Sequence, residues 1–195
     1  MPRMATIATV CVLAASCSSA PPHFYTLSHN ATAGVRPGAT SSNLSVIVGP
    51  VSIPAIDDVP QITVRNSPNA VSLEEFNRWA SPLQSNISHV VADNLGEMLG
   101  TTRVSLSSQS VNADADYRVA IDVQTFESVP GNAATLSALW IVRTAGGKSQ
   151  IGRTTVREAS PEKGFAALAA AHSRALAHLS QDIADTIVVL DQQGK

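Results

Sequence analysis

The chain has 195 residues, of which 44% are hydrophobic and 14% charged, and its formal net charge is −2 at pH 7. This length suits one domain with its own core and is too short for two comfortable ones. The low charge leaves no basic footprint for nucleic acid, so nucleic-acid binding is disfavoured.

The first 16 residues have the pattern of a secretory signal peptide. Arg3 provides a positive start, and the apolar stretch 4–15 that follows is too short to span a bilayer. The run Leu-Ala-Ala-Ser-Cys at 13–17 resembles a lipobox, in which the cysteine is acylated and becomes the new N-terminus. An ordinary exported protein, cleaved at a nearby small residue, is the alternative. We expect lipid attachment at Cys17, and Ser18 after it favours the outer membrane.

Cysteine usage agrees with export. Cleavage before Cys17 removes Cys11, the only other cysteine, and leaves a mature chain without a free thiol. This is expected in an oxidising envelope compartment. Two or more acyl chains give stable anchoring, whereas a single chain gives marginal binding. After residue 20, no run approaches the roughly 18 apolar residues of a membrane helix.

Residues 17–43 are rich in Ser, Pro, Ala, Thr and Gly, and we expect a lipidated cysteine followed by a flexible tether. Its one apolar island is the segment 24–27, which suits a short edge strand held on the domain. The single periplasmic domain is expected over 44–195.

The stretch 44–65 combines two β-branched runs with a proline-rich excursion between them. Proline cannot donate a ladder hydrogen bond, so the sequence predicts a strand, a rigid loop carrying Asp57 and Asp58, and a return strand that ends at Arg65. A paired acid site, an exposed turn and a salt bridge to Arg65 are the alternatives for the two aspartates. A segment of this kind suits a binding edge better than a catalytic cleft.

Two long helices are predicted, each with apolar residues at helical spacing. The first follows Ser81-Pro82 and ends at Gly100, and the second follows Ser160-Pro161 and runs to about residue 190. Ser72 and Glu75 have the spacing of a capping box, which predicts a short helix or turn. Trp79 either closes the core or belongs to an exposed contact, and His172 is expected in the core.

Four further strands are predicted, over 103–106, 117–126, 136–142 and 150–158, and the last three form an antiparallel meander. The expected fold class is α/β, as a two-layer sandwich. Its sheet is mixed but largely antiparallel, with about five or six strands, and the two long helices cover one face.

The sequence carries no recognisable catalytic motif. The chain has no G-x-S-x-G elbow, and the run Gly-Lys-Ser at 147–149 lacks the glycine of a Walker loop and sits in a predicted hairpin turn. Asp114 and Asp116 lack the glycine and glutamate of an EF-hand. We expect no enzyme activity, no metal site and no cofactor.

Several runs together resemble the PqiC-type ABC-transport auxiliary lipoproteins. The resemblance is carried by VGPVSIP at 48–54, Pro60-Gln61-Ile62 followed by Arg65, Arg78-Trp79-Ala80, Asp116-Tyr117-Arg118-Val119, Leu136-Ser137-Ala138-Leu139-Trp140 and Leu179-Ser180-Gln181-Asp182. These runs occur in the family's order over about residues 24–190.

The resemblance implies an outer-membrane lipoprotein that faces the periplasm and acts as an adaptor. Its implied partners are an MCE-domain protein and an inner-membrane permease of a lipid transport system linked to envelope integrity. Assembly with further copies of the same chain is left as an alternative. The expected contact residues are Asp57, Pro60, Gln61, Arg65 and Trp79. A phospholipid-binding periplasmic carrier, with its groove between the last helix and the sheet, is the main alternative, and a cryptic hydrolase is a weaker one.

Overall fold

The computed structural model describes residues 20–30, 43–109 and 114–193. The elements in chain order are β1 (His23–Tyr25), β2 (Val46–Ser52), β3 (Gln61–Ser67), β4 (Ala70–Trp79), α1 (Leu83–Leu99), β5 (Val104–Leu106), β6 (Tyr117–Val129), β7 (Ala133–Thr144), β8 (Ser149–Ala159) and α2 (Phe165–Gln193). Within these residues neither helix combines the length and apolar character that crossing a membrane requires.

The eight strands form one mixed sheet that is organised around β6. β7 pairs along one edge of β6, and β8 extends the sheet from there. Along the other edge, β2 and β3 lie one after the other, because β2 pairs with the first half of β6 and β3 pairs at Ser128. β5 then continues from β2, while β4 and β1 continue from β3.

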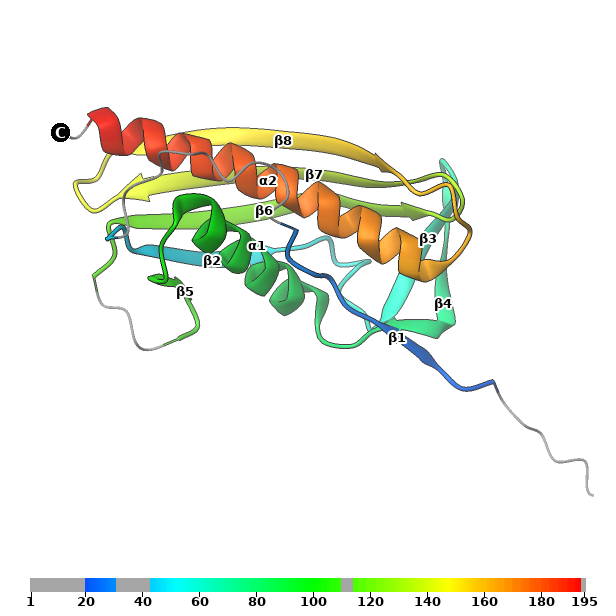
Figure 1. The fold of residues 1–195 in the computed structure, drawn as a ribbon. Helices are drawn as coiled ribbons and strands as arrows, with labels where there is room; N and C mark the ends of the chain where they lie inside the picture. The colour runs from blue at the N-terminus through cyan, green and yellow to red at the C-terminus, as the bar shows by residue number, and fades with distance from the viewer. Residues whose placement is uncertain (1–19, 31–42, 110–113, 194–195) are drawn as a thin grey trace, which may run out of the picture.

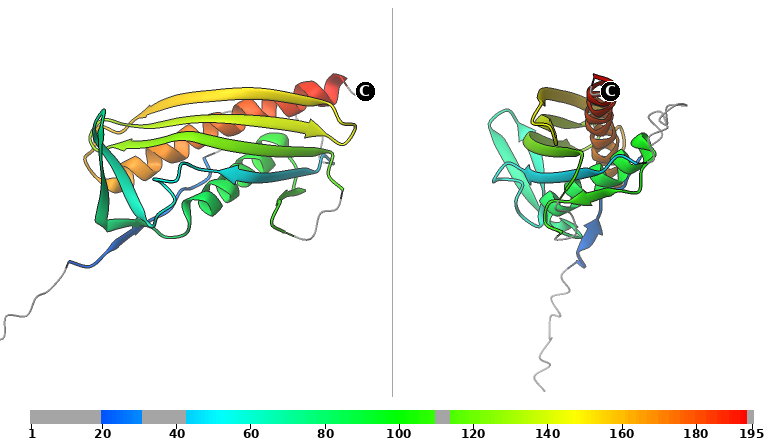
Figure 2. Two further views of the ribbon diagram at one scale, coloured as in Figure 1. Left: turned by 180° about the vertical axis from the view of Figure 1, so that it is seen from behind. Right: turned by 90° about the vertical axis from the view of Figure 1, so that its left-hand side faces the viewer.

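The sheet is strongly curled, and both helices cover one of its faces (Figure 2). β3 and β4 stand steeply at the end of the molecule where the chain enters through β1, and the C-terminus lies at the opposite end (Figure 1). β2 and β3 pair with different parts of the same edge of β6, so the sheet divides into two branches there. Strand twist accumulates along each branch, and the sheet therefore curves around the helices. The end of the domain that carries β1 and the end that carries the last turn of α2 are therefore separated by about the length of α2 (Figure 1).

The core lies between the curled sheet and the apolar stripes of the two helices. Its fully buried members on α2 include Leu176, Leu179 and Ile183, and those on α1 include Ile87 and Leu95. Truncating a side chain of this kind to alanine typically costs about 2–5 kcal/mol, as the lost transfer free energy adds to that of a cavity. The predicted stripes are thus the faces that hold the domain together.

Several expectations are confirmed. Two long helices lie on one face, and the first ends at Gly100, whose φ of 63° is a left-handed C-cap. The proline-rich stretch forms two strands with a loop between them, and the apolar island near residue 24 contributes β1, which pairs in parallel with β4. Trp79 and His172 are both buried in the core.

The predicted strand number and the predicted pairing are wrong. The sheet has eight strands rather than five or six, and four of its seven pairings are parallel: β1 with β4, β2 with β5, β2 with β6, and β3 with β6. Parallel pairing joins segments that are distant in the chain, so no turn between them announces it. Only the meander β6–β7–β8 is antiparallel, as expected, together with the hairpin β3–β4.

Two local predictions also differ. The capping-box segment 72–76 belongs to β4, because Val71, Ser72 and Leu73 pair with β3. α1 begins at Leu83 with Pro82 as its N-cap, and α2 begins at Phe165 rather than directly after Pro161.

Candidate functional site: the proline-rich loop and the groove over Trp79

The loop between β2 and β3 is held in a fixed shape by its own backbone. The Asp57 N–H donates to the Pro54 carbonyl at 2.9 Å, and the Trp79 N–H donates to the Pro60 carbonyl at 2.8 Å. The prolines restrict φ in the same segment. The loop is therefore closed on itself and fastened to the end of β4.

Asp57 lies inside this loop rather than on its surface, with 7% of the residue exposed. Burial raises the pKa of its carboxyl to about 6, because the charged form is poorly solvated there. A hydrogen bond with the Thr63 hydroxyl and the charge of Arg65 lower the pKa, while the nearby Glu127 carboxylate raises it. An exposed turn, which was one explanation of this residue, is wrong.

Arg65 forms its ion pair with Glu127 rather than with Asp57. Its Nε lies 2.6 Å from Glu127 Oε1, and a guanidinium nitrogen donates to the Pro68 carbonyl at 3.1 Å. Both side chains are one-third exposed. Arg65 thus joins β3 to β6 and also steadies the turn into β4.

A groove of about 350 Å³ lies beside the loop. One wall is the loop segment 58–60, and the other is the segment 79–83 that leads into α1. Pro60 is exposed at its edge and Gln61 is half-buried in the adjoining strand. The groove is the concave, mainly apolar feature that adjoins the expected contact residues.

Trp79 belongs to the floor of this groove and to the core beneath it. The residue is 5% exposed, and its ring lies edge-on to Phe126 and His172, with centroids 6.1 Å and 6.4 Å away. Trp79 therefore supports the groove from below and closes the core. Of the five expected contact residues, the structure brings Pro60, Gln61 and Arg65 to the surface and places Asp57 and Trp79 underneath.

A buried serine–histidine pair was not anticipated from the sequence. Ser128 Oγ and His172 Nε2 are 2.9 Å apart, and His172 stacks on Phe126 with 3.9 Å between ring centroids. Burial lowers the pKa of His172 to about 3. Both residues are shielded from solvent, so no substrate reaches them. The alternation of β6 in the sequence places Ser128 outward, and a register shift between Val123 and Thr125 turns it inward. The pair is a packing feature.

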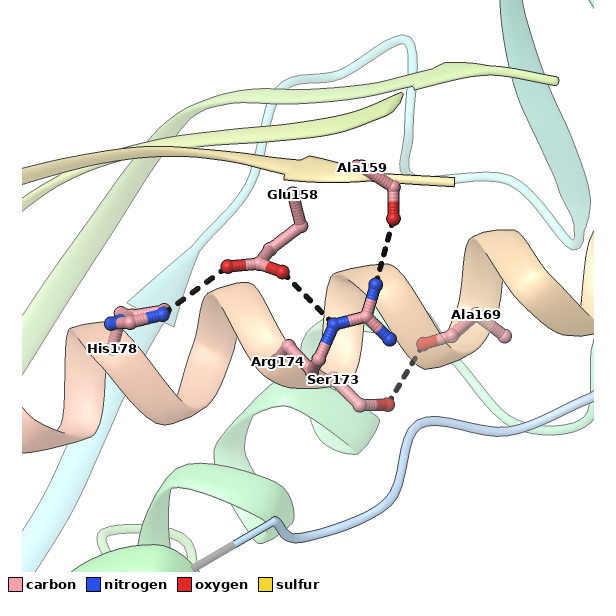
Figure 3. Close-up of polar contacts among 6 residues, drawn as sticks. All are labelled: Glu158, Ala159, Ala169, Ser173, Arg174 and His178. Carbon is pink, nitrogen blue, oxygen red and sulfur yellow. Dashed lines mark hydrogen bonds and ion pairs between the residues drawn. The ribbon is translucent and has the colours of Figure 1, made fainter. Parts of the chain in front are cut away.

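Polar contacts fix α2 against the edge strand β8. Glu158 lies between two side chains of the helix, with Oε2 at 2.9 Å from Arg174 Nε and Oε1 at 3.2 Å from His178 Nε2 (Figure 3). Arg174 also donates to the Ala159 carbonyl at 2.8 Å. These contacts hold the register of the helix along the strand.

The face of α2 that carries its alanines is closely packed. Ala171, Ala175 and Leu176 have no exposed surface, so these described residues leave no groove between helix and sheet. The expected location of a lipid-carrier groove is therefore filled. In the same part of the chain that the structure describes, no cluster of three or more His, Cys, Asp or Glu side chains could hold a metal ion.

The segment after β1 is strapped across both helices. Leu27 is buried, the Ser28 N–H donates to Ser173 Oγ of α2 at 3.1 Å, and the Asn30 N–H donates to Asn94 Oδ1 of α1 at 3.0 Å. The body of the domain therefore holds the chain from β1 onward. Cys17, the expected attachment site, lies outside the described residues.

Comparison with known structures supports the fold. A crystal structure described only as an uncharacterized protein is similar with a TM-score of 0.70 and 18% identity, covering 86% of this chain and 99% of that one. Protein XCC0632 from Xanthomonas campestris, of the DUF330 family, is similar with a TM-score of 0.67 and 23% identity, covering 88% and 98%.

Other comparisons add less. PelC from Paraburkholderia phytofirmans, crystallised as a dodecamer, has a TM-score of 0.40 and 14% identity, covering 72% and 84%, which supports no statement about assembly. No curated protein matches the chain.

One family model matches most of the chain. Residues 25–184 match the family described as the ABC-type transport auxiliary lipoprotein component, and this range runs from β1 to the last third of α2. The chain therefore belongs to the ABC-type transport auxiliary lipoprotein family.

Proposed function

We propose that this auxiliary lipoprotein is of the PqiC type and serves as an adaptor at the outer membrane. In this proposal residues 1–16 are the signal peptide, Cys17 carries the acyl chains, and the body faces the periplasm. The partners are an MCE-domain protein and an inner-membrane permease that move lipid between the membranes. The established family membership supports the transport context, and the runs that resemble PqiC-type proteins support the subtype.

The observation that carries the adaptor role is the rigid loop with its groove. Pro60 lines an apolar hollow, its carbonyl is fixed by the Trp79 N–H, and Gln61 follows it as the half-buried first residue of β3. A preformed surface loses little conformational freedom on binding, which favours affinity for a protruding segment of a partner. The role requires contact and no chemistry.

A matched pair of substitutions tests this edge. Gln61→Glu places a charge beside the groove, whereas Gln150→Glu makes the same change at an exposed position of β8. We expect Gln61→Glu to reduce co-purification with the MCE-domain protein after crosslinking in intact cells, and Gln150→Glu to leave it unchanged. Equal recovery of the partner with both variants would remove the loop from the contact surface.

Charge reversal at Asp57 or Arg65 is a poorer test. Asp57 is buried, so a reversed charge there disturbs the fold. Reversal at Arg65 places two negative charges together at Glu127, so its effect is not confined to the contact surface. Attachment is tested separately by Cys17→Ala, which should release the mature protein from the membrane fraction. Acyl mass on Cys17 of the wild-type protein is the direct measurement.

A further inference from the structure

Large apolar side chains are exposed mainly at one end of the molecule. Seven such side chains are exposed among the described residues, and five of them belong to β1, β4 or the loop before β3: Phe24 (61%), Ile56 (50%), Val71 (38%), Leu73 (49%) and Phe76 (39%). The other two, Ile151 and Val189, belong to β8 and to the C-terminal part of α2. Scattered single residues need no explanation, but a group at one end does.

Strand register and one hydrogen bond place three of the five beside one another on the outer face of β3 and β4. Leu73 is opposite Thr63 and Val71 is opposite Arg65, on the face away from the buried Ile62. The Thr63 hydroxyl donates to the Ile56 carbonyl at 3.2 Å, which holds the Ile56 segment over the same face.

The fourth position follows from the neighbouring strand. Phe24 is opposite Arg78 of β4, and Arg78 is opposite Gln61 of β3. The register of β3 with β4 shifts between Gln61 and Thr63, so Phe24 is placed at the same end of the sheet by its pairing with β4, beyond this irregularity. We call Phe24, Ile56, Val71 and Leu73 the apolar patch.

The length of the chain before β1 decides what can cover this patch. His23, the first residue of β1, comes six residues after Cys17. Six residues reach at most about 20 Å when fully extended. Acyl chains on Cys17 therefore keep β1, and with it Phe24, within about 20 Å of the bilayer surface, and the rest of the patch follows along β4 at the same end of the molecule.

The other end of the molecule is held away from that surface. α2 has 29 residues, which at a rise of 1.5 Å each extend about 43 Å. Figure 1 shows the helix running from the end near β3 and β4 to the C-terminus at the far end. A domain tied at β1 thus presents its patch end to the bilayer more readily than Ile151 or Val189.

We propose that the apolar patch rests in the interface of the bilayer that holds the Cys17 acyl chains. The proposal rests on the lipid attachment given under the proposed function. Because the tether makes docking intramolecular, a small patch is sufficient. Phe, Leu, Ile and Val insert into the boundary between headgroups and acyl chains. The tethered lipoprotein is then oriented on the membrane and does not tumble at the end of its tether.

Charge does not drive this contact. Arg65 and Arg78 lie beside the patch, but Arg65 is paired with Glu127, and Asp58, Glu74 and Glu75 are close in the chain. Acidic side chains oppose attraction to anionic lipid. We therefore expect docking to persist on zwitterionic phosphatidylcholine, which has no net charge, and in high salt.

Single cysteines in the full-length lipidated protein test the proposal. The mature chain has no other free thiol once Cys17 is acylated, so Leu73→Cys and Ile151→Cys can each be labelled with bimane. Both sites are exposed, which leaves the fold intact. Each labelled protein is reconstituted into phosphatidylcholine vesicles with and without a lipid that carries a nitroxide near its headgroup.

The label at position 73 is expected to lose most of its emission to the lipid-borne nitroxide and to be shielded from aqueous iodide. The label at position 151 is expected to keep its emission with the nitroxide lipid and to be quenched by iodide. Equal response at the two sites would overturn the proposal, as would a label at 73 that is shielded from both quenchers, which indicates a second copy or a partner protein.

Flotation of the same vesicles separates this outcome from failure of the anchor. A protein that carries no acyl mass and stays at the bottom of the gradient contradicts lipid attachment itself. A protein that floats but shows no lipid quenching at 73 contradicts the orientation alone.

Discussion

The Arg65 guanidinium and the Glu127 carboxylate meet at 2.6 Å, where β3 leaves the edge of β6. Asp57 is close enough to respond to both charges, although it pairs with neither and hydrogen-bonds to Thr63. This ion pair therefore links β3 to β6 where the sheet divides. Its two charges also act on the carboxyl of Asp57, in the loop that adjoins the groove.

The two members of the pair should move the pKa of Asp57 in opposite directions. Glu127→Gln removes a negative charge and should lower this pKa below about 6, whereas Arg65→Gln removes a positive charge and should raise it. Carboxyl chemical shifts followed by NMR through a pH titration measure both. Glu162→Gln, at an exposed site between β8 and α2, is the control and should leave the pKa in place. Shifts of the same sign in both variants would contradict this account.

The stability change from losing this pair should be small. Both side chains are one-third exposed, and exposed ion pairs contribute about 0–1 kcal/mol. The loop is stabilised mainly by its backbone bonds and prolines.

Asp57→Asn should make the protein more stable at neutral pH. The folded-state pKa of about 6 is above the ordinary value of 3.8, so the folded state keeps a proton that the unfolded state loses between these values. The free energy of unfolding therefore falls as the pH rises from about 4 to 6, and asparagine removes this loss. Urea unfolding at pH 4 and pH 7 measures the effect. An equal gain or loss at both pH values would show that the ionisation of Asp57 is not its cause.

His172 should have the opposite pH dependence. Its folded-state pKa is lowered from 6.5 to about 3, so its contribution to stability is complete above pH 6.5 and is lost as the pH falls toward 3. One proton bound only in the unfolded state corresponds to about 1.4 kcal/mol per pH unit. The double variant Ser128→Ala with His172→Phe removes the titrating ring and also the hydroxyl that would otherwise lose its partner.

Comparison of unfolding curves from pH 4 to 6 distinguishes the two groups. In the wild-type protein the contributions of Asp57 and His172 partly cancel over this range. The double variant should therefore lose stability as the pH rises, and Asp57→Asn should gain it. His89→Gln, at an exposed position of α1, should leave the wild-type curve unchanged. A double variant with the wild-type slope would mean that His172 does not titrate on unfolding in this range.

Local patterns predicted those parts of the fold that depend on neighbours in the chain. The stripe of α2 and the alternation of β6 and β7 are visible in the sequence, because burial on one face imposes a period. The pairing of β2 with β6 and of β1 with β4 is not visible, because parallel partners are far apart in the chain. The capping-box spacing at Ser72 was misleading for a different reason: pairing with the neighbouring strand β3 overrides a local preference.

The sequence predicted where the candidate site lies, but it predicted the roles of only some of its residues. Prolines announced a rigid loop, and the structure brings Pro60 and Gln61 to its surface. The pairing of Arg65 with Glu127 depends on a residue 62 positions further along the chain, for which no local pattern exists. Charge patterning alone therefore suggested the wrong ion-pair partner.

Gly152, the one glycine of β8, should be sensitive to substitution. A Cβ at this position would overlap the indole ring of Trp140, which lies across the strand and donates from Nε1 to Thr154 Oγ1 at 3.0 Å. Gly152→Ala should therefore displace the ring and lower the free energy of unfolding by about 1–3 kcal/mol, as is usual for overpacking. Gly146→Ala, in the preceding turn, is the matched control, because its Cβ would meet only Thr144 Oγ1 at an ordinary 3.8 Å. Urea unfolding measures both, and tryptophan fluorescence reports whether the ring of Trp140 has moved. A Gly152→Ala protein as stable as Gly146→Ala, with unchanged fluorescence, would show that the ring can shift without cost and that the close approach of Trp140 to β8 does not constrain the sheet.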